Sequence, residues 1–227
     1  MNFQKIGGLA ALYEGLAYIV GIAFFLGMVN FQEASDPLEK MALLVEHQGA
    51  MAGVNLIIYV IFGVALVVLS LALHARLADG SPALMQTATA FGLIWAGVVI
   101  ASGMVFNIGM GVAVDVFATD PAQAATIWQP IEAVADGIGG GVEVLGGLWA
   151  FLVSWAALRT ARLPKLLNYL GLLVGVAGIV TIVPALGEIG GMVFGLTQII
   201  WFIWLGIAMM VGRSATRQAE AVRPAQA

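Results

Sequence analysis

The apolar stretches of this chain constrain its fold more than any other feature. Six of them are long enough to cross the hydrocarbon of a bilayer, which takes about 20 residues. They are approximately Ile6–Val29, Gly49–Leu73, Leu84–Gly109, Ile138–Leu158, Leu166–Pro184 and Gly190–Gly212. Hydrophobic residues make up 61% of the 227 residues and charged residues only 10%. The sequence therefore predicts an all-α integral membrane bundle of six transmembrane helices over residues 1–212, followed by a short polar tail at 213–227.

The nine basic residues predict the orientation of this bundle. All but Lys40 fall at the ends of spans that share one side of the membrane: Lys5, Arg76, Arg159, Arg162, Lys165, Arg213, Arg217 and Arg223. Because Lys and Arg accumulate on the cytoplasmic side, we expect both termini in the cytoplasm. The opposite loops are acidic, with Glu33, Asp36, Glu39, Glu46, Asp115, Asp120, Glu132 and Asp136. The predicted partner is thus the lipid bilayer, and nothing in the charge pattern indicates nucleic-acid binding.

Short helices are predicted within the two outer loops. Asp36-Pro37 and Asp120-Pro121 each place a helix-capping residue before a proline at the first helical position. Ser81-Pro82 is the same type of start signal for the third span. The linker 159–165 is short, so the fourth and fifth spans are expected to be antiparallel neighbours.

Glycines are abundant within the predicted spans. Gly171 with Gly175, and Gly191 with Gly195, form G-x-x-x-G pairs, a pattern that lets helices approach closely in lipid. The run Gly139–Gly141 has two interpretations, a loop-to-helix junction or a locally unwound helix of the kind that lines binding sites in carriers. The six tryptophans fit interface anchoring or packing, and an aromatic cage for a cation is the alternative.

Glu14 is the leading candidate for a functional residue. It follows Lys5 by nine residues, which places it about 13 Å into the predicted first span. A charge inside a bilayer is costly, so an intramembrane carboxyl is a functional hypothesis by default. Glu14 must face water, bond to a neighbour such as Tyr13 or Tyr18, or carry a proton. A neutral acid bonded to another helix and a site for a proton, cation or headgroup both remain open.

Other polar residues are predicted to lie at comparable depths in the outer half of the bundle. Candidate ligand-binding residues, besides Glu14, are Glu143, Asn55, Asn107, Glu188 and, deeper in the sixth span, Gln198. Depth alone therefore predicts an acidic and amide-lined vestibule that opens outward and narrows toward Gln198 and Glu14. For Glu188 and Asp136 the alternative is a solvated helix end.

Several chemistries lack the residues that they require. The chain has no cysteine and only two histidines, which excludes thiolate sites, paired-histidine haem ligation and a His-rich zinc site. Ser102 has no intramembrane histidine to activate it. We therefore predict no catalytic residues, no metal and no cofactor, although a carboxylate-only Ca²⁺ site in the acidic outer loops is a less favoured alternative.

Three short motifs resemble a known family. They are K-I-x-G-L at Lys5–Leu9, Asp120-Pro121-Ala122-Gln123, and Arg159-x-x-x-Leu163-Pro164-Lys165. With the six spans, they resemble the bacterial membrane family catalogued as domain of unknown function 4386. The resemblance implies a small inner-membrane, multi-pass protein without an assigned activity, and it carries over no functional residues. This chain differs from the family pattern at Trp149, where a histidine is usual, and at Glu143, where members tend to be apolar.

These observations favour one function over two others. The first is binding or transport of a small molecule, lipid or ion through the predicted vestibule. The second is an accessory or structural subunit of a membrane complex, acting through a homo-oligomer or a membrane-protein partner. The third, an intramembrane enzyme acting on lipid, is the least favoured because no nucleophile and base can be paired.

Overall fold

The computed structural model describes residues 2–29, 34, 36–140 and 143–211, and this part of the chain is helical without strands. The α-helices are α1 (Phe3–Phe24), α2 (Pro37–Glu46), α3 (Gln48–Asn55), α4 (Phe62–Leu77), α5 (Pro82–Phe117), α6 (Pro121–Ala135), α7 (Val144–Thr160), α8 (Lys165–Val180) and α9 (Gly187–Val211). Short π-helical segments at Phe25–Val29, Leu56–Ile61 and Asp136–Gly140 extend α1, α3 and α6. The all-α prediction is confirmed, whereas the predicted tail, Gly212, Glu33 and Gly141 lie outside the described residues.

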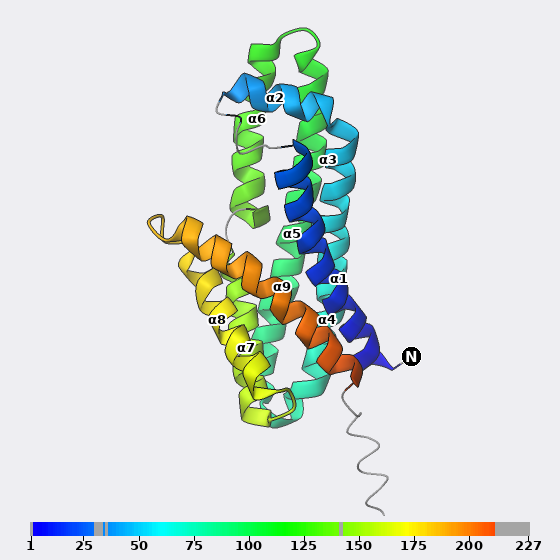
Figure 1. Ribbon diagram of the computed structural model, residues 1–227, viewed down its shortest axis with the longest axis vertical. Helices are drawn as coiled ribbons and strands as arrows, with labels where there is room; N and C mark the ends of the chain where they lie inside the picture. Colours follow the sequence, from blue (N-terminus) through cyan, green and yellow to red (C-terminus); the bar gives the residue numbers. More distant parts are fainter. Residues whose placement is uncertain (1, 30–33, 35, 141–142, 212–227) are drawn as a thin grey trace, which may run out of the picture.

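The helices form two regions along the length of α5 (Figure 1). The bundle contains α1, α4, α7, α8, α9 and the first part of α5. The cap contains α2, α3, α6 and the end of α5, and α2 crosses it just below the turn between α5 and α6. With 36 residues, α5 is about 54 Å long, whereas bilayer hydrocarbon is about 30 Å thick. One helix therefore reaches through both regions and is longer than the hydrocarbon is thick.

Among the described residues, five stretches are long and apolar enough to cross a membrane: Phe3–Val29, Gln48–Gly80, Pro82–Phe117, Pro121–Thr160 and Gly187–Val211. The predicted fifth span corresponds to α8, an apolar helix of only 16 residues. The chain thus has the helices of a multi-pass membrane protein. The number of six spans and the cytoplasmic location of the termini stay predictions.

The predicted outer-loop helices are present as α2 and α6. The Asp36 carboxylate accepts a hydrogen bond from the backbone N–H of Leu38 at 3.0 Å, and Asp120 accepts one from Gln123 at 2.9 Å. These bonds satisfy N–H groups that a helix start leaves without a partner. Helix α5 begins at Pro82, as predicted.

The start of the fourth predicted span differs from the prediction. It was expected at Ile138, but Asp136–Gly140 is a π-helical segment and α7 begins at Val144. The reason is the glycine run, because glycine loses more backbone entropy in a helix than any other residue. The fifth span likewise ends at Val180, four residues before Pro184, which cannot continue a helix.

Two arginines join the turns at the end of the bundle opposite the cap, which we call the basic end. The Arg76 guanidinium donates to the carbonyl of Arg162 through Nε and Nη2 at 3.3 and 3.1 Å. Arg162 Nη1 in turn donates to the carbonyl of Arg76, and the Arg162 guanidinium pairs with Asp79 at 3.4 Å. The α4–α5 and α7–α8 turns therefore lie together, as the charge pattern predicted.

Candidate functional site

A cavity of about 380 Å³ lies where the bundle meets the cap. Its wall comes from α1, α4, α5, the residue before α7 and the three π-helical segments Phe25–Val29, Leu56–Ile61 and Asp136–Gly140. The lining residues are Ala17, Tyr18, Gly21, Ile22, Phe25, Leu26, Ile58, Tyr59, Phe62, Trp95, Val99, Gly139 and Glu143. A mostly apolar cavity with few polar groups is typical of sites for small organic ligands, which occupy about 300–1,000 Å³.

Glu143 is the acidic side chain in this wall, and the backbone around it is held by α8. Its N–H donates to Thr181 Oγ1 at 3.0 Å, and its carbonyl accepts from Gly147 N–H at 2.8 Å. Gly139 brings the preceding segment against α5, because a Cβ there would lie 3.2 Å from the carbonyl oxygen of Val98. Gly139 thus allows the chain to pass close to α5 shortly before Glu143.

Three aromatic residues close the cavity toward the basic end. Tyr18, Phe62 and Trp95, which we call the aromatic floor, are the large lining residues nearest that end on α1, α4 and α5. Phe62 lies edge-on to both others, with ring centroids 5.7 Å from Tyr18 and 5.7 Å from Trp95. Edge-to-face rings attract each other, so the floor is a packed barrier.

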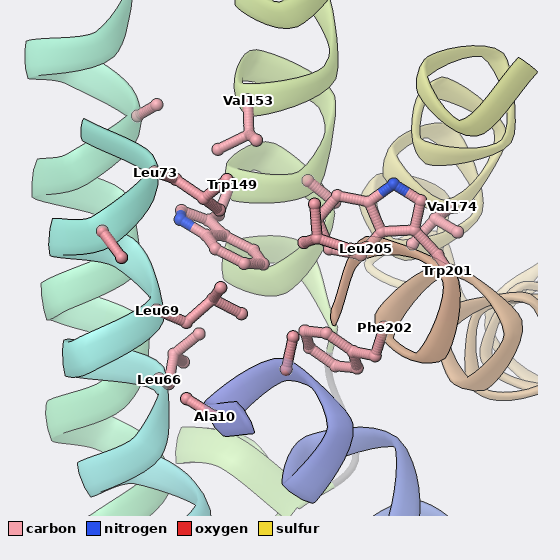
Figure 2. Packing of buried hydrophobic residues seen from close by; sticks show 14 of the residues in the cluster. Ala10, Leu66, Leu69, Leu73, Trp149, Val153, Val174, Trp201, Phe202 and Leu205 are labelled. Atoms are coloured by element: carbon pink, nitrogen blue, oxygen red, sulfur yellow. The ribbon is translucent and has the colours of Figure 1, made fainter. Parts of the chain in front are cut away.

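Further aromatic rings support the floor from below. Trp149 lies 5.7 Å from Trp95, and Phe202 lies 6.3 Å from Tyr18. Figure 2 shows Trp149, Trp201 and Phe202 gathered between α4, α7 and α9. Trp149 is fully buried in this cluster and serves as a packing residue.

The cavity also has an opening toward the outer surface of the bundle. Ile22 and Leu26 line it, yet they are 39% and 60% exposed. Both lie near the end of the first apolar stretch, in a chain with five membrane-length helices. An apolar molecule that reaches this surface through the bilayer would therefore meet apolar side chains at the cavity rim.

The structure separates the candidate residues that the sequence placed in one vestibule. Among the six, Glu143 lines the cavity. Asn55 Nδ2 donates to Asn107 Oδ1 at 3.2 Å, and Asn107 Nδ2 donates to the carbonyl of Ala52 at 3.2 Å. These two amides thus tie α3 to α5. Glu188 is exposed at the start of α9, as its alternative interpretation expected.

Glu14 and Gln198 are fully buried outside the cavity wall. Neither side chain has a hydrogen-bond partner among the described residues. Tyr13, a predicted partner of Glu14, instead donates its hydroxyl to the carbonyl of Ile57 at 2.8 Å. The cavity is therefore more aromatic and less acidic than depth alone predicted.

Sequence reasoning missed the aromatic side chains of the cavity wall. Tyr18 follows Glu14 by one helical turn, which could have marked it as a wall residue. Tyr59 and Phe62 lie in an apolar stretch that has no such signal, and the assignment of tryptophans to anchoring or packing left Trp95 out of the site.

Comparison with known proteins agrees with the suspected resemblance. The family model described as Domain of unknown function (DUF4386) matches residues 9–214. No curated protein and no solved structure matches the chain. The matched region includes the whole cavity wall. Because the model covers most of the sequence, this chain belongs to the DUF4386 family of proteins with a domain of unknown function.

Proposed function

We propose that the protein binds a small amphiphilic molecule with an amine group in the cavity beside Glu143, and that it does so in the bacterial inner membrane. The observation that carries this proposal is an apolar and aromatic cavity with a single carboxyl group in its wall. A carboxylate forms strong, charge-assisted hydrogen bonds with an ammonium group. The faces of Tyr, Trp and Phe rings also attract cations.

The shape of the site favours an amphiphile over a free ion. Ile22, Leu26 and Ile58 give a hydrocarbon tail apolar contacts, and Glu143 gives the head group a carboxyl partner. A bare cation would need several oxygen ligands. The exposed rim residues support entry from the bilayer. The proposal contains no catalytic step.

Binding without transport is the simpler form of the proposal. The aromatic floor separates the cavity from the basic end, so passage through the bundle would require Tyr18, Phe62 and Trp95 to move apart. Transport is thus a second step, which the same ligand can test in sealed vesicles.

Three probes of equal chain length test the chemistry of the site: dodecylamine, dodecanol and dodecanoate. We expect the amine to bind most tightly to the purified protein, with a change in tryptophan fluorescence because Trp95 lines the cavity. Loss of a hydrogen bond between charged groups costs about 1.5–3 kcal/mol, so Glu143→Gln should weaken amine binding about 10- to 100-fold. Dodecanol binding should change little.

Glu188→Gln is the matched control, because Glu188 is an exposed acid outside the cavity wall. It should leave amine binding at the wild-type level. Equal amine affinity in wild type and Glu143→Gln, or a preference for dodecanoate, would reject the proposal.

The alternative is an accessory subunit of a membrane complex, and one observation favours it. A Cβ on Gly191 or Gly195 of α9 would meet no atom within 4 Å, whereas Gly171 and Gly175 are packed against α7 and α9. The first G-x-x-x-G pair thus serves packing within the chain, and the second is open to another helix. Native mass spectrometry of protein extracted in mild detergent tests this role. A stoichiometric protein partner lost in Gly195→Leu would support it, and a monomer carrying a small molecule would support the binding role.

A further inference from the structure

Glu14 and Gln198 are two buried polar residues that lie outside the cavity wall. Both side chains have no exposed surface. The two carboxyl oxygens of Glu14 and the amide oxygen and nitrogen of Gln198 are buried without a hydrogen-bond partner in the described part of the chain. Buried polar groups in native proteins are nearly always hydrogen-bonded, so four such atoms in one part of a bundle need an explanation.

The two residues lie on helices that touch at their level. A Cβ on Gly15 would lie 2.9 Å from Ile203 Cγ1 and 3.5 Å from both the carbonyl oxygen of Ile199 and Phe202 Cβ. Glu14 precedes Gly15, and Gln198 precedes Ile199. The close α1–α9 contact therefore places the unpaired carboxyl and the unpaired amide on adjacent helices.

Glu14 also faces the interior of the bundle. Ala10, one turn earlier on the same face of α1, lies beside Leu66 of α4 (Figure 2). Tyr18, one turn later, packs on Phe62 and Phe202. One turn is about 6 Å, so Glu14 lies on the side of the aromatic floor away from the cavity, at a short distance from it.

No basic residue in the described part of the chain is placed to neutralise Glu14. On α1, Lys5 is about 13 Å away along the helix, and α9 carries no Lys or Arg from Gly187 to Val211. On α4, His74 and Arg76 lie at the basic end, with hydrogen bonds to Thr89 and Arg162.

The other ionisable groups around Glu14 cannot supply a positive charge either. Tyr13 and Tyr18 lie on α1, the helix that carries Glu14. Tyr59 and Glu143 line the cavity on the other side of the aromatic floor. All four are neutral or acidic. An ionised carboxylate at Glu14 would thus be a buried charge without a partner, which is very costly.

We infer that Glu14 is a proton-binding site inside the bundle, with the Gln198 amide as its neighbouring hydrogen-bonding group. Addition of one proton converts the carboxylate into a neutral carboxylic acid, with one O–H donor and one C=O acceptor. A primary amide offers the complementary acceptor and donors. A small side-chain movement that brought the protonated acid and the amide into hydrogen-bond contact would therefore satisfy both groups without an ion, whereas it would leave a carboxylate charged.

Infrared spectroscopy of the purified wild-type protein tests this site without any added ligand. The spectrum at neutral pH should contain the C=O stretch of a buried protonated carboxylic acid. Glu14→Gln keeps the side-chain size and should remove this band, whereas Glu188→Gln should leave it unchanged. Gln198→Leu should keep the band but shift it to higher frequency, because the carbonyl loses a hydrogen-bond donor.

Two further measurements separate this site from the cavity and from a failure to fold. Glu14→Asp retains a carboxylic acid and should therefore retain the C=O band at a shifted frequency. This variant shows whether the band is lost in Glu14→Gln because the acid is absent or because the protein is misfolded. Dodecylamine binding depends on Glu143 and not on Glu14. If the protein does not bind dodecylamine, the infrared result for Glu14 therefore still stands. A wild-type spectrum without the band, or a band that persists in Glu14→Gln, overturns the proton site, and an unshifted band in Gln198→Leu overturns the pairing.

Discussion

The cap and the bundle are packed by different means. In the bundle, helices meet backbone to backbone at glycines, such as Gly147 of α7 against Gly178 of α8 and Gly8 of α1 against Gly206 of α9. In the cap, large side chains fill the interior, including Met41, Leu44, Met51, Met110 and Trp128. The cap glycines Gly49, Gly53 and Gly111 meet nothing within 4 Å, and Gly109 against Ile131 is the exception.

This difference resembles the one between helices packed in lipid and helices packed in water. Between helices in lipid the hydrophobic effect contributes little, so close backbone approach and van der Waals contact must hold the bundle. In water, burying a large apolar side chain stabilises the fold by about 1.5–3 kcal/mol. The close glycine contacts of the bundle are therefore the packing expected of helices in lipid, whereas the cap is packed in the way that is usual for helices in water.

Trp128→Ala should cause the largest loss of stability, and the loss should be confined to the cap. Trp128 is 2% exposed and lies edge-on to Phe106 at 4.8 Å. Loss of a buried tryptophan costs about 3–5 kcal/mol. Hydrogen exchange should show faster opening of α2 and α6, with α7 and α8 unchanged. The half-exposed Trp155 gives the control, since Trp155→Ala should leave the cap at wild-type protection. Equal loss of protection in cap and bundle would show that the two regions unfold together.

Gly147→Ala should cause the second-largest loss of stability, and this loss should arise in the bundle. A Cβ there would lie 2.7 Å from the Gly175 carbonyl oxygen and 2.7 Å from the Ile179 nitrogen, and backbone atoms cannot move aside easily. We expect a loss of about 1–3 kcal/mol, typical of overpacking, measured as a lower unfolding temperature in detergent.

Gly195→Ala on α9 is the matched control for Gly147→Ala, because its Cβ meets no atom within 4 Å. It should leave stability unchanged or raise it by up to about 1 kcal/mol, the helix-propensity gain of alanine over glycine. If both variants lose equal stability, glycine packing does not distinguish α7 from the open face of α9.

The sequence predicted the fold wherever local chemistry decides structure. Asp36 and Asp120 before prolines specified the starts of α2 and α6, and the basic residues placed Arg76 and Arg162 at one end. The length of α5 was underestimated, because the apolar stretch was taken to end at Gly109 whereas the helix continues to Phe117. A helix that leaves the membrane keeps its backbone hydrogen bonds, so hydropathy does not mark its end.

The candidate site was less predictable, because depth in a span says nothing about the direction of a side chain. Asn55 and Asn107 were expected in the vestibule, but they turn toward each other. Glu143 reaches the cavity through the local path of the glycine run, which sequence left open between two interpretations. Direction depends on helix rotation and tilt, and these follow from packing over the whole bundle.

The smallest predicted effect concerns how helices start in the two regions. The Asp120 side chain caps α6, whereas α7 begins without a side-chain cap and the N–H of Glu143 bonds instead to Thr181, the residue after α8. Asp120→Ala should therefore cost about 0.5–2 kcal/mol, seen as faster hydrogen exchange in the first turn of α6 only. Asp115→Ala removes an equally exposed carboxylate that caps no helix and should change nothing there. If Asp115→Ala speeds exchange in the first turn of α6 equally, the loss of protection reflects the net charge of the cap. The start of α6 would then depend on packing, as the start of α7 does.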